Sequence, residues 1–323
     1  MRLLMGLGVG QRLRERGFAP EVGHHREWDS GEVTYVHPMG VQTEERYGAP
    51  DLMMHRAELH GALASLIPEQ SVHFNKKLVG LEPAGSRIAL AFVDGSRAQA
   101  DAVIGADGIH SVVRELVFGA EELRFTGQVA YRAVFPTRLL GGAGFDDRVK
   151  WWGTDRHIVS YILDPRRDEI YFMASTPEPD FVNESWSAPG DLGELREAFA
   201  AFHPRARSLL DACPSVRKWA LIERNPISRW SSDGVMLIGD ACHPMLPYMA
   251  QGASSSMEDA VVLARCFASA GPDDVNAVFR RCEANRKERT SAFQAGSRQN
   301  SWMRTTAGID WVYEYDAWNV PLS

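Results

Sequence analysis

One stretch of the chain, Val235–Leu263 (VMLIGDACHPMLPYMAQGASSSMEDAVVL), constrains the fold more than any other. Its first four residues form an apolar run that is short enough to be a buried strand. The pair Gly239-Asp240 ends this run, and two prolines forbid a helix across the loop that follows. An amphipathic helix is predicted after Gly252, where serines offer N-cap side chains. The N-terminus of this helix faces back toward the strand end and favours an anion there.

The string GDACHPMLPYMAQGASSSMEDA (residues 239–260) resembles the second FAD-binding motif of the flavin-dependent aromatic hydroxylases, the family of salicylate and hydroxybenzoate hydroxylases. The resemblance implies that the Gly239-Asp240 pair binds FAD, with Asp240 bonding the ribityl chain. It also implies that Pro244 lies near the isoalloxazine ring. Gly252 and Ala253 would bring backbone N–H groups to the flavin pyrimidine edge, where negative charge collects on reduction. The competing interpretation is an ordinary strand–loop–helix turn.

A second motif of the same family follows another predicted strand. Residues 107–114 (DGIHSVVR) match the family pattern D-G-x-x-S-x-x-R, which implies that Asp107 and Gly108 sit near the FAD pyrophosphate and ribose. Arg114 could be a cofactor ligand or could hold the loop, since it lies three residues from Ser111 on one helical face. Arg56, in an R-x-x-L element at a strand-to-helix junction, is a further cofactor candidate. The alternative for Arg56 is a solvated side chain at a helix N-terminus.

The first glycine-rich turn of a dinucleotide-binding fold is not found. Gly6, Gly8 and Gly10 have GxGxG spacing, no apolar strand precedes them and no ribose-binding acid follows. In the family, a helix like the one predicted over Met1–Arg16 comes after the first βαβ unit, so we expect the chain to begin about one such unit late.

These motifs together predict an α/β chain. Its fold class is a Rossmann-like FAD/NAD(P)-binding domain of the hydroxybenzoate hydroxylase type, N-terminally incomplete, with an inserted antiparallel-sheet substrate domain. Short β-rich segments with charged turns follow Phe118 and form the predicted sheet. The predicted boundaries are 1–118 and 228–290 for the FAD-binding domain, 119–227 for the substrate domain, and 291–323 for a C-terminal helix and aromatic tail.

The predicted sheet carries the substrate-binding candidates. His157 and Tyr161 are four residues apart and therefore point to the same face of a strand. Such a pair can bond a phenol and a carboxylate, and a neutral His could accept the phenol proton. Arg148 could pair with a carboxylate if it faces inward. The alternative is a half-buried aromatic face that packs under a loop.

The ring class of the substrate stays open. Residues 148–161 (with KWW and DRH) and Glu283–Arg289 look like the 6-hydroxynicotinate 3-monooxygenases. Two positions depart from that pattern. Tyr248 stands where those enzymes tend to have His, and Arg148 replaces a small thiol residue. In its segment LPYMAQGA, Tyr248 is closer to salicylate and 3-hydroxybenzoate hydroxylases.

The resemblance implies a reaction in which NADH or NADPH reduces FAD, O₂ forms a flavin C4a-hydroperoxide, and a phenolic or hydroxypyridine carboxylic acid is hydroxylated. The catalytic candidates are His157, Tyr161, His243 and Tyr248, of which His243 could also be only a part of the cofactor loop. No metal site is expected. Other flavoprotein oxidations, such as epoxidation, and a flavin-poor binding or dimerisation module are the alternative functions.

Composition narrows the partners and the compartment. The 323 residues carry a formal net charge of −7 with no basic block, which argues against nucleic acid as a partner. Four cysteines without a CxxC pattern fit reduced thiols. No apolar run approaches the roughly 18 residues of a membrane helix. We therefore expect a cytoplasmic enzyme with no membrane partner, and the family suggests a homodimer.

Overall fold

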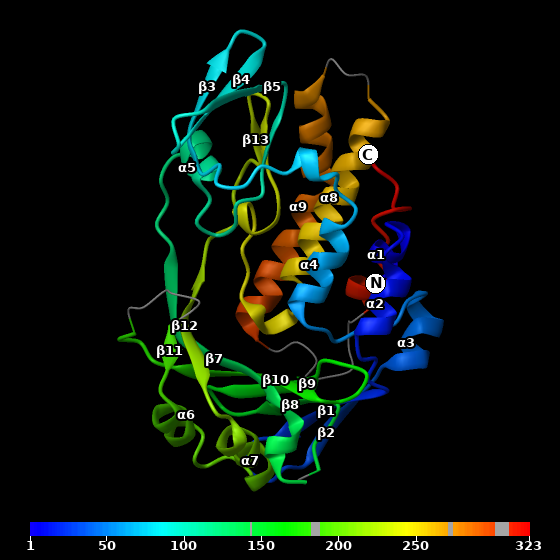
Figure 1. Ribbon diagram of the computed structural model, residues 1–323, viewed down its shortest axis with the longest axis vertical. Coiled ribbons are helices and arrows are strands. Elements are labelled where there is room, and N and C mark those ends of the chain that lie inside the picture. Colours follow the sequence, from blue (N-terminus) through cyan, green and yellow to red (C-terminus); the bar gives the residue numbers. More distant parts are fainter. Residues whose placement is uncertain (143, 182–187, 271–273, 301–309) are drawn as a thin grey trace. The chain divides into compact units, whose positions relative to one another are not determined.

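The computed structural model describes residues 1–142, 144–181, 188–270, 274–300 and 310–323, and its contacts divide the chain into two compact units (Figure 1). Unit 1 contains Met1–Leu66, Phe125–Leu221 and residues 310–314. Unit 2 contains Ile67–Arg124, residues 222–300 and Tyr315–Ser323. These units follow contacts and not function, so the functional domain boundaries stay a prediction.

An eight-stranded sheet with the order β11-β12-β7-β10-β9-β8-β1-β2 forms the centre of unit 1. Its strands are β1 (Val22–Glu27), β2 (Val33–Pro38), β7 (Arg124–Pro136), β8 (Arg148–Trp152), β9 (His157–Ile162), β10 (Glu169–Pro177), β11 (Pro189–Gly190) and β12 (Val216–Glu223). The pairs β8–β9, β9–β10 and β10–β7 are antiparallel, whereas β1 runs parallel to β8. The sheet is therefore larger than the predicted insert, because the hairpin β1–β2 from the N-terminal region extends it beside β8.

The helices of unit 1 are short. They are α1 (Arg2–Gly6), α2 (Gly10–Arg16), α3 (Gly40–Tyr47), α4 (Arg56–Ala64), α6 (Leu192–Ala198), α7 (Pro204–Ala212) and α10 (Asp310–Tyr313), with a 3-10 turn η2 (Thr137–Leu140). The single helix predicted over Met1–Arg16 was wrong. Gly8 has a φ of +83°, a left-handed conformation that a continuing helix cannot contain, so the segment breaks into α1 and α2.

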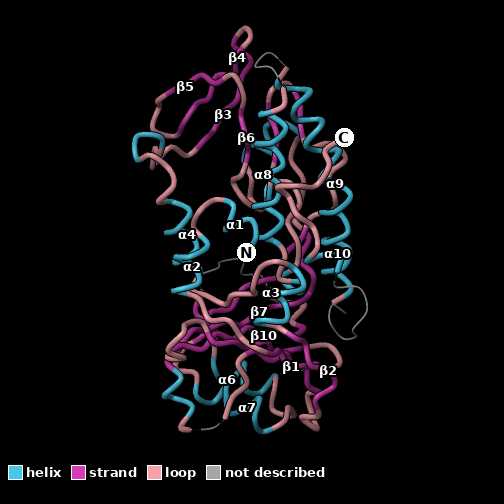
Figure 2. Tube along the Cα trace, turned by 90° about the vertical axis from the view of Figure 1, so that its right-hand side faces the viewer, coloured by secondary structure: helices cyan, strands magenta, loops and turns pink. Residues whose placement is uncertain are grey.

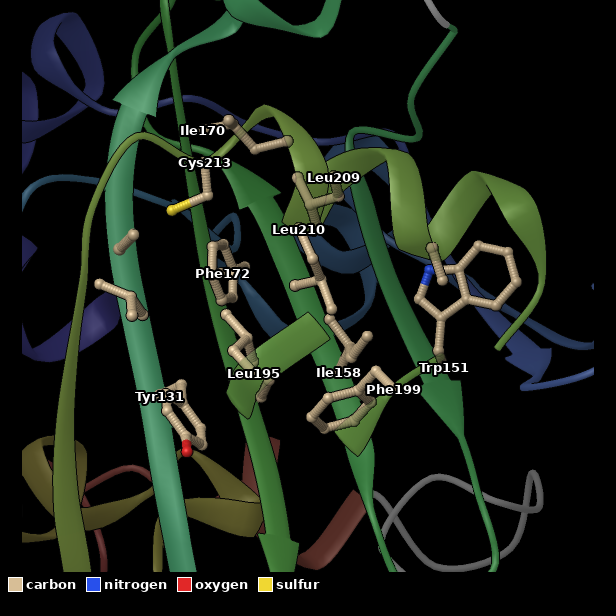
Figure 3. Packing of buried hydrophobic residues seen from close by; sticks show 14 of the residues in the cluster. Tyr131, Trp151, Ile158, Ile170, Phe172, Leu195, Phe199, Leu209, Leu210 and Cys213 are labelled. Carbon is tan, nitrogen blue, oxygen red and sulfur yellow. The ribbon is translucent and has the colours of Figure 1, made fainter. Parts of the chain in front are cut away.

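Helices α6 and α7 cover one face of this sheet (Figures 1 and 2). Every second residue of the central strands points to that face. Ile158 and Phe172 belong to one buried cluster with Leu195 and Leu209 of the helices (Figure 3), and Trp151 on the same face stacks on His203 at 5.7 Å between ring centroids. Because successive side chains alternate, the residues between them point to the opposite face. This alternation determines which side chains of unit 1 lie on the face that α6 and α7 leave uncovered and are therefore available for a site.

The described residues of unit 2 form two small sheets, three α-helices and three short 3-10 helices (η). Its elements are η1 (Glu69–Ser71), β3 (Leu78–Ala84), β4 (Arg87–Phe92), β5 (Arg97–Ala100), β6 (Val103–Gly105), α5 (Val112–Phe118), β13 (Ser231–Ser232), β14 (Val235–Leu237), η3 (Gly239–Ala241), η4 (Pro247–Met249), α8 (Gly252–Ala268) and α9 (Val275–Gln299). The sheets have the orders β13-β14-β6 and β3-β4-β5, and β14 runs parallel to β6. The predicted strand–loop–helix path of residues 235–263 is thus confirmed. The expected serine N-cap was wrong, because α8 already begins at Gly252 and Ser256 Oγ donates to the Gly252 carbonyl inside the helix. Helix α9 ends at Gln299, where Asn300 has a left-handed φ of +45°.

Helices α8 and α9 pack against each other through buried side chains that include Val262, Cys266, Phe279 and Cys282. None of the described helices combines the length and apolar content that crossing a lipid bilayer requires.

Candidate functional site

The turn after β14 exposes a carboxylate on a tightly held backbone. Gly239 has a φ of +59°, and a Cβ at this position would lie 2.7 Å from Ser256 Oγ, so only glycine fits without movement. Asp240, the next residue, is exposed, whereas Ala241, Cys242 and His243 behind it are buried. The turn therefore presents one acidic side chain from a rigid base.

The N-terminus of α8 lies beside this carboxylate. A Cβ added to Gly252 would be 3.9 Å from Asp240 Oδ1, and no side chain caps the helix at Gln251. The first N–H groups of a helix have no partner within the helix, so those of Gly252 and Ala253 can donate to a ligand. The Asp240 carboxylate can accept hydrogen bonds from the hydroxyl groups of the FAD ribityl chain. The neighbouring backbone amides can donate hydrogen bonds to the electron-rich pyrimidine edge of the flavin.

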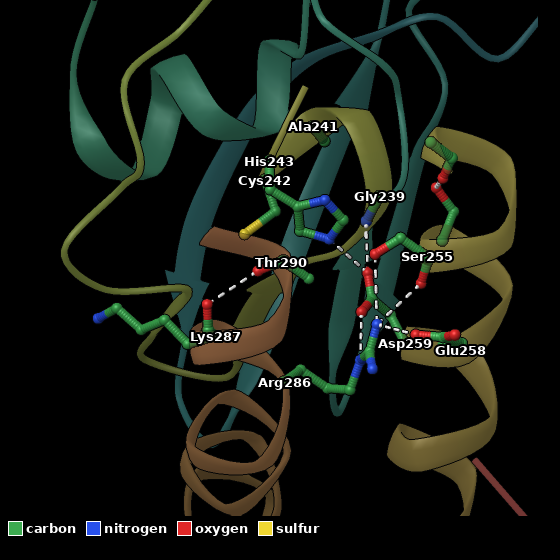
Figure 4. A network of polar contacts seen from close by, with 12 residues as sticks. Gly239, Ala241, Cys242, His243, Ser255, Glu258, Asp259, Arg286, Lys287 and Thr290 are labelled. Carbon is green, nitrogen blue, oxygen red and sulfur yellow. Dashed lines mark hydrogen bonds and ion pairs between the residues drawn. The ribbon is translucent and has the colours of Figure 1, made fainter. Parts of the chain in front are cut away.

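A buried network holds the turn from behind (Figure 4). Asp259 on α8 accepts from the Gly239 N–H at 3.0 Å and from Arg286 Nε at 2.8 Å, and it lies 2.6 Å from His243 Nε2. Burial alone would raise the pKa of Asp259, but His243 and Arg286 outweigh that effect and hold it below its usual range. The carboxylate is therefore ionised at neutral pH.

This network bears on the catalytic prediction for His243. The imidazole is 2% exposed and its Nε2 is engaged by Asp259, while the Trp230 ring lies 5.3 Å away between centroids. These contacts favour the interpretation of His243 as a part of the cofactor loop. The sequence analysis did not predict the roles of Asp259 and Arg286. Both are charged residues on the apolar faces of their helices, and a charged residue at such a position could have indicated a buried ion pair.

Asp107 and Arg114 make contacts within the protein. The Asp107 carboxylate accepts from Ser111 Oγ at 2.5 Å and from the N–H groups of Val112 and Val113 at 2.8 and 3.1 Å, so it caps α5. Arg114 is 2% exposed and its Nη1 donates to the carbonyls of Ala241 and Cys242 at 3.3 and 2.9 Å. Of the two alternatives for Arg114, these contacts support the one in which it holds the loop.

The second group of candidates lies on the face of the large sheet opposite α6 and α7. Strand register places Arg148 directly across from Tyr161, and Tyr161 across from Tyr171. In the same way His157 lies across from Trp152 on β8. The predicted substrate residues Arg148, His157 and Tyr161 therefore share one face within unit 1.

Arg148 reaches over the N-terminal hairpin. A Cβ at Gly23 of β1 would lie 2.5 Å from Arg148 Nη1, so the absent side chain of Gly23 makes room for the guanidinium. Gly23 pairs with His37 on β2, and His25 follows two residues later on the same face. Burial and then Arg148 lower the pKa of His25 to about 3 and that of His37 to about 4. Both histidines are neutral at pH 7 beside the Arg148 guanidinium, and no sequence motif pointed to them.

The protonation states of the predicted pair are also set by burial. His157 is 2% exposed, and burial followed by the nearby Lys150 lowers its pKa well below the usual value. Burial raises the pKa of Tyr161 above its usual range. At neutral pH the face therefore offers a neutral imidazole, which can accept a proton, and a protonated phenol, which can donate a hydrogen bond.

Comparison with known proteins decides the family. The chain matches the family described as "FAD binding domain" over residues 1–293. It is 42% identical to a 6-hydroxynicotinate 3-monooxygenase of Bordetella bronchiseptica, over 100% of this chain and 84% of that enzyme. A 6-hydroxynicotinate 3-monooxygenase of Pseudomonas fluorescens is 39% identical with the same coverage. The chain belongs to the FAD binding domain family of FAD-dependent monooxygenases.

Solved structures agree with this family at the level of the fold. HpxO of Klebsiella pneumoniae, complexed with FAD and uric acid, superposes with a TM-score of 0.82 at 26% identity, over 97% of this chain and 80% of that one. A salicylate hydroxylase substrate complex gives 0.85 at 23% identity, over 98% and 86% of the two chains. The predicted α/β fold of the hydroxybenzoate hydroxylase type and the prediction of FAD as cofactor are therefore confirmed.

The remaining cofactor-binding and catalytic candidates differ in how exposed they are. Arg56 is exposed at the start of α4 in unit 1. Gly108 has a φ of +80° with open space around its missing Cβ, which suits a close approach by a ligand. Pro244 is buried and Tyr248 is half-buried within η4. Their roles stay predictions. In the described part of the chain, no cluster of three or more His, Cys, Asp or Glu side chains could hold a metal ion.

Proposed function

We propose that this FAD-dependent hydroxylase acts on a ring acid whose hydroxyl and carboxylate lie at opposite ends of the ring, as in 6-hydroxynicotinate. The observation that carries this proposal is the shared sheet face of Arg148, Tyr161 and His157. Four residues along a strand separate the Cα atoms of His157 and Tyr161 by about 13 Å. Both side chains lie on the same face of the sheet, and this spacing suits a ring with polar groups at both ends.

Each side chain has a task at its own end. Arg148 pairs with the carboxylate, and the Tyr161 hydroxyl directly across from it donates a hydrogen bond to the same group. His157, held neutral, accepts the proton of the ring hydroxyl, which raises the electron density of the ring. Trp152 and Tyr171 on the same face exclude water around the ring.

Asp240, Gly252 and Ala253 hold FAD at the turn after β14. When bound, FAD supplies the redox chemistry, taking electrons from NADH or NADPH and delivering them to O₂. The two relatives, at 42% and 39% identity, carry out 3-hydroxylation of 6-hydroxynicotinate by name, which supports an N-heteroaromatic acid over a salicylate.

The test is a substrate panel with the purified chain and added FAD. A visible spectrum first establishes that flavin is bound. NADH and NADPH consumption and hydroxylated product are then measured with 6-hydroxynicotinate, 4-hydroxybenzoate, 3-hydroxybenzoate and salicylate. We expect product with the first or second acid and little with the others. Product from salicylate but not from 6-hydroxynicotinate would contradict the proposed geometry.

A further inference from the structure

The loop that carries the FAD-binding residues is fastened to α8 and α9 at two backbone points (Figure 4 shows the first). One point is the Gly239 N–H, which donates to Asp259. The other is the Pro244 carbonyl, which accepts from Gln294 Nε2 at 3.0 Å. Both are main-chain atoms, so each anchor fixes the path of the backbone and not only one side chain.

The first anchor is a complete charge cluster. Asp259 and Arg286 are each 0% exposed, and Arg286 Nη2 also lies 2.7 Å from Glu258 Oε2. Removing water from a carboxylate is costly unless charges and hydrogen bonds replace it, and here a guanidinium, an imidazole and a backbone amide do so. The Asp259 carboxylate therefore ties α9, His243 and the turn before Asp240 into one unit.

The second anchor lies farther along α9. Gln294 is 3% exposed, so its hydrogen bond to the Pro244 carbonyl is shielded from competing water. Two residues later, Gly296 leaves a notch for the loop, because a Cβ there would lie 2.6 Å from Met249 Sδ. The face of α9 is thus shaped around residues 244–249 of the loop.

We propose that Asp259 and Gln294 are positioning residues for the flavin: they act through the Gly239–Asp240 turn and the Pro244 carbonyl to hold the loop in the FAD-binding conformation. The inference rests on FAD binding by this loop, as in the proposed function. The two anchors lie at opposite ends of the segment between Gly239 and Pro244, and Arg114 holds the carbonyls of Ala241 and Cys242 between them, so losing one anchor releases only that end of the loop.

The neighbouring residues provide matched controls. Glu258, next to Asp259, pairs with Arg286 and Arg289 and has no hydrogen bond to the loop among the described residues, so Glu258→Gln weakens the charge cluster but keeps the Asp259 bond to the Gly239 N–H. Arg298, one turn after Gln294, bonds Glu223 and the carbonyl of Arg224, which lie outside the loop. The variants Glu258→Gln and Arg298→Gln therefore disturb the same two helices without releasing an anchor.

The experiment compares Asp259→Asn and Gln294→Leu with these two controls. The FAD dissociation constant is titrated by flavin fluorescence at a temperature where circular dichroism shows each apoprotein to be folded. The melting temperature of the apoprotein and the visible circular dichroism of bound flavin are measured on the same samples. With substrate present, NADH or NADPH oxidised without product is recorded as uncoupling.

We expect the two anchor variants to raise the FAD dissociation constant by about tenfold or more, alter the visible circular dichroism of the flavin and increase uncoupling. The controls should stay within about twofold of the wild type even if their melting temperatures fall equally. The inference is overturned if the dissociation constants of all four variants follow their melting temperatures, or if the anchor variants bind FAD as the wild type does. A wild-type chain that binds no FAD would overturn the proposed function and this inference together.

Discussion

The sheet face of unit 1 and the turn of unit 2 place their functional groups by different physical means. On the sheet, Arg148 and Tyr161 are neighbours because the register of β8 and β9 sets them opposite each other. At the turn, the groups offered to FAD include backbone amides, and their position depends on buried side chains such as Asp259. A side chain on the sheet can therefore be substituted while the backbone stays unchanged. The conformation of the turn, in contrast, depends on contacts from helices that are distant along the sequence.

The two regions also differ in charge. The sheet face holds the cations Arg148 and Lys150 beside histidines kept neutral, which suits an acidic substrate. The turn offers the exposed Asp240 next to an uncapped helix N-terminus, which suits hydroxyl groups and an electron-rich ring edge. Variants should thus separate substrate effects from cofactor effects.

The largest difference between the effect on substrate turnover and the effect on cofactor binding is expected from His157→Gln. Loss of the group that accepts the ring hydroxyl proton should lower kcat/KM by about a hundredfold, within the range of general-base contributions. The FAD dissociation constant should not change. Product formation from 6-hydroxynicotinate measures the first quantity and flavin fluorescence the second. Ser160→Ala, on the same strand but on its opposite face, is the control, and an equal loss in that variant would argue for general damage to the sheet.

Asp240→Ala should show the opposite pattern. Removing a charged hydrogen-bond acceptor costs about 1.5–3 kcal/mol, so the FAD dissociation constant should rise by about tenfold to a hundredfold. Because Asp240 is exposed, the free energy of unfolding of the apoprotein should change less than the free energy of flavin binding. Flavin retained after gel filtration gives the simplest measurement, and Asp101→Ala, another exposed aspartate of unit 2, is the control. Unchanged flavin content in Asp240→Ala would refute the proposed role.

Acid should weaken unit 1 through its neutral histidines. His37 has a folded pKa of about 4, below its unfolded value, so the unfolded chain binds more protons between about pH 6.5 and 4 and stability falls as the pH falls through that window. In His37→Leu, the decrease in the free energy of unfolding from pH 7.5 to pH 5 should be smaller by about 2 kcal/mol. Urea unfolding at the two pH values measures it. Equal losses in both proteins would show that His37 does not titrate as inferred.

The smallest effect is expected from Arg148→Met. The KM for a ring carboxylic acid should rise about tenfold because one charged pair is lost, with the FAD dissociation constant unchanged. A hydroxypyridine without a carboxylate serves as the comparison substrate and should lose nothing. Gly23→Ala tests Arg148 without replacing it, because the new Cβ at residue 23 would clash with Arg148 Nη1 and displace the guanidinium. If both substrates suffer equally, the guanidinium does not bind the carboxylate.

The parts of the site that depend on short-range sequence patterns could be predicted. The path from Val235 through the loop to α8 follows from an apolar run, a Gly-Asp pair and prolines, all of which act on neighbouring residues. The common face of His157 and Tyr161 follows from the period of a strand. The break at Gly8 was missed because local helix periodicity does not report a left-handed glycine.

By itself, the sequence determined the residue types that carry the chemistry and the order of strands, turns and helices that displays them, because these depend on short-range periodicity and backbone preference. Only the tertiary structure decided that β1 and β2 extend the large sheet beside β8, that Gly23 makes room for Arg148, and that Asp259 and Arg286 close behind the turn. Each of these contacts joins residues that are distant along the chain. Their partners are selected by packing and by the cost of burying charge, which no local pattern in the sequence records.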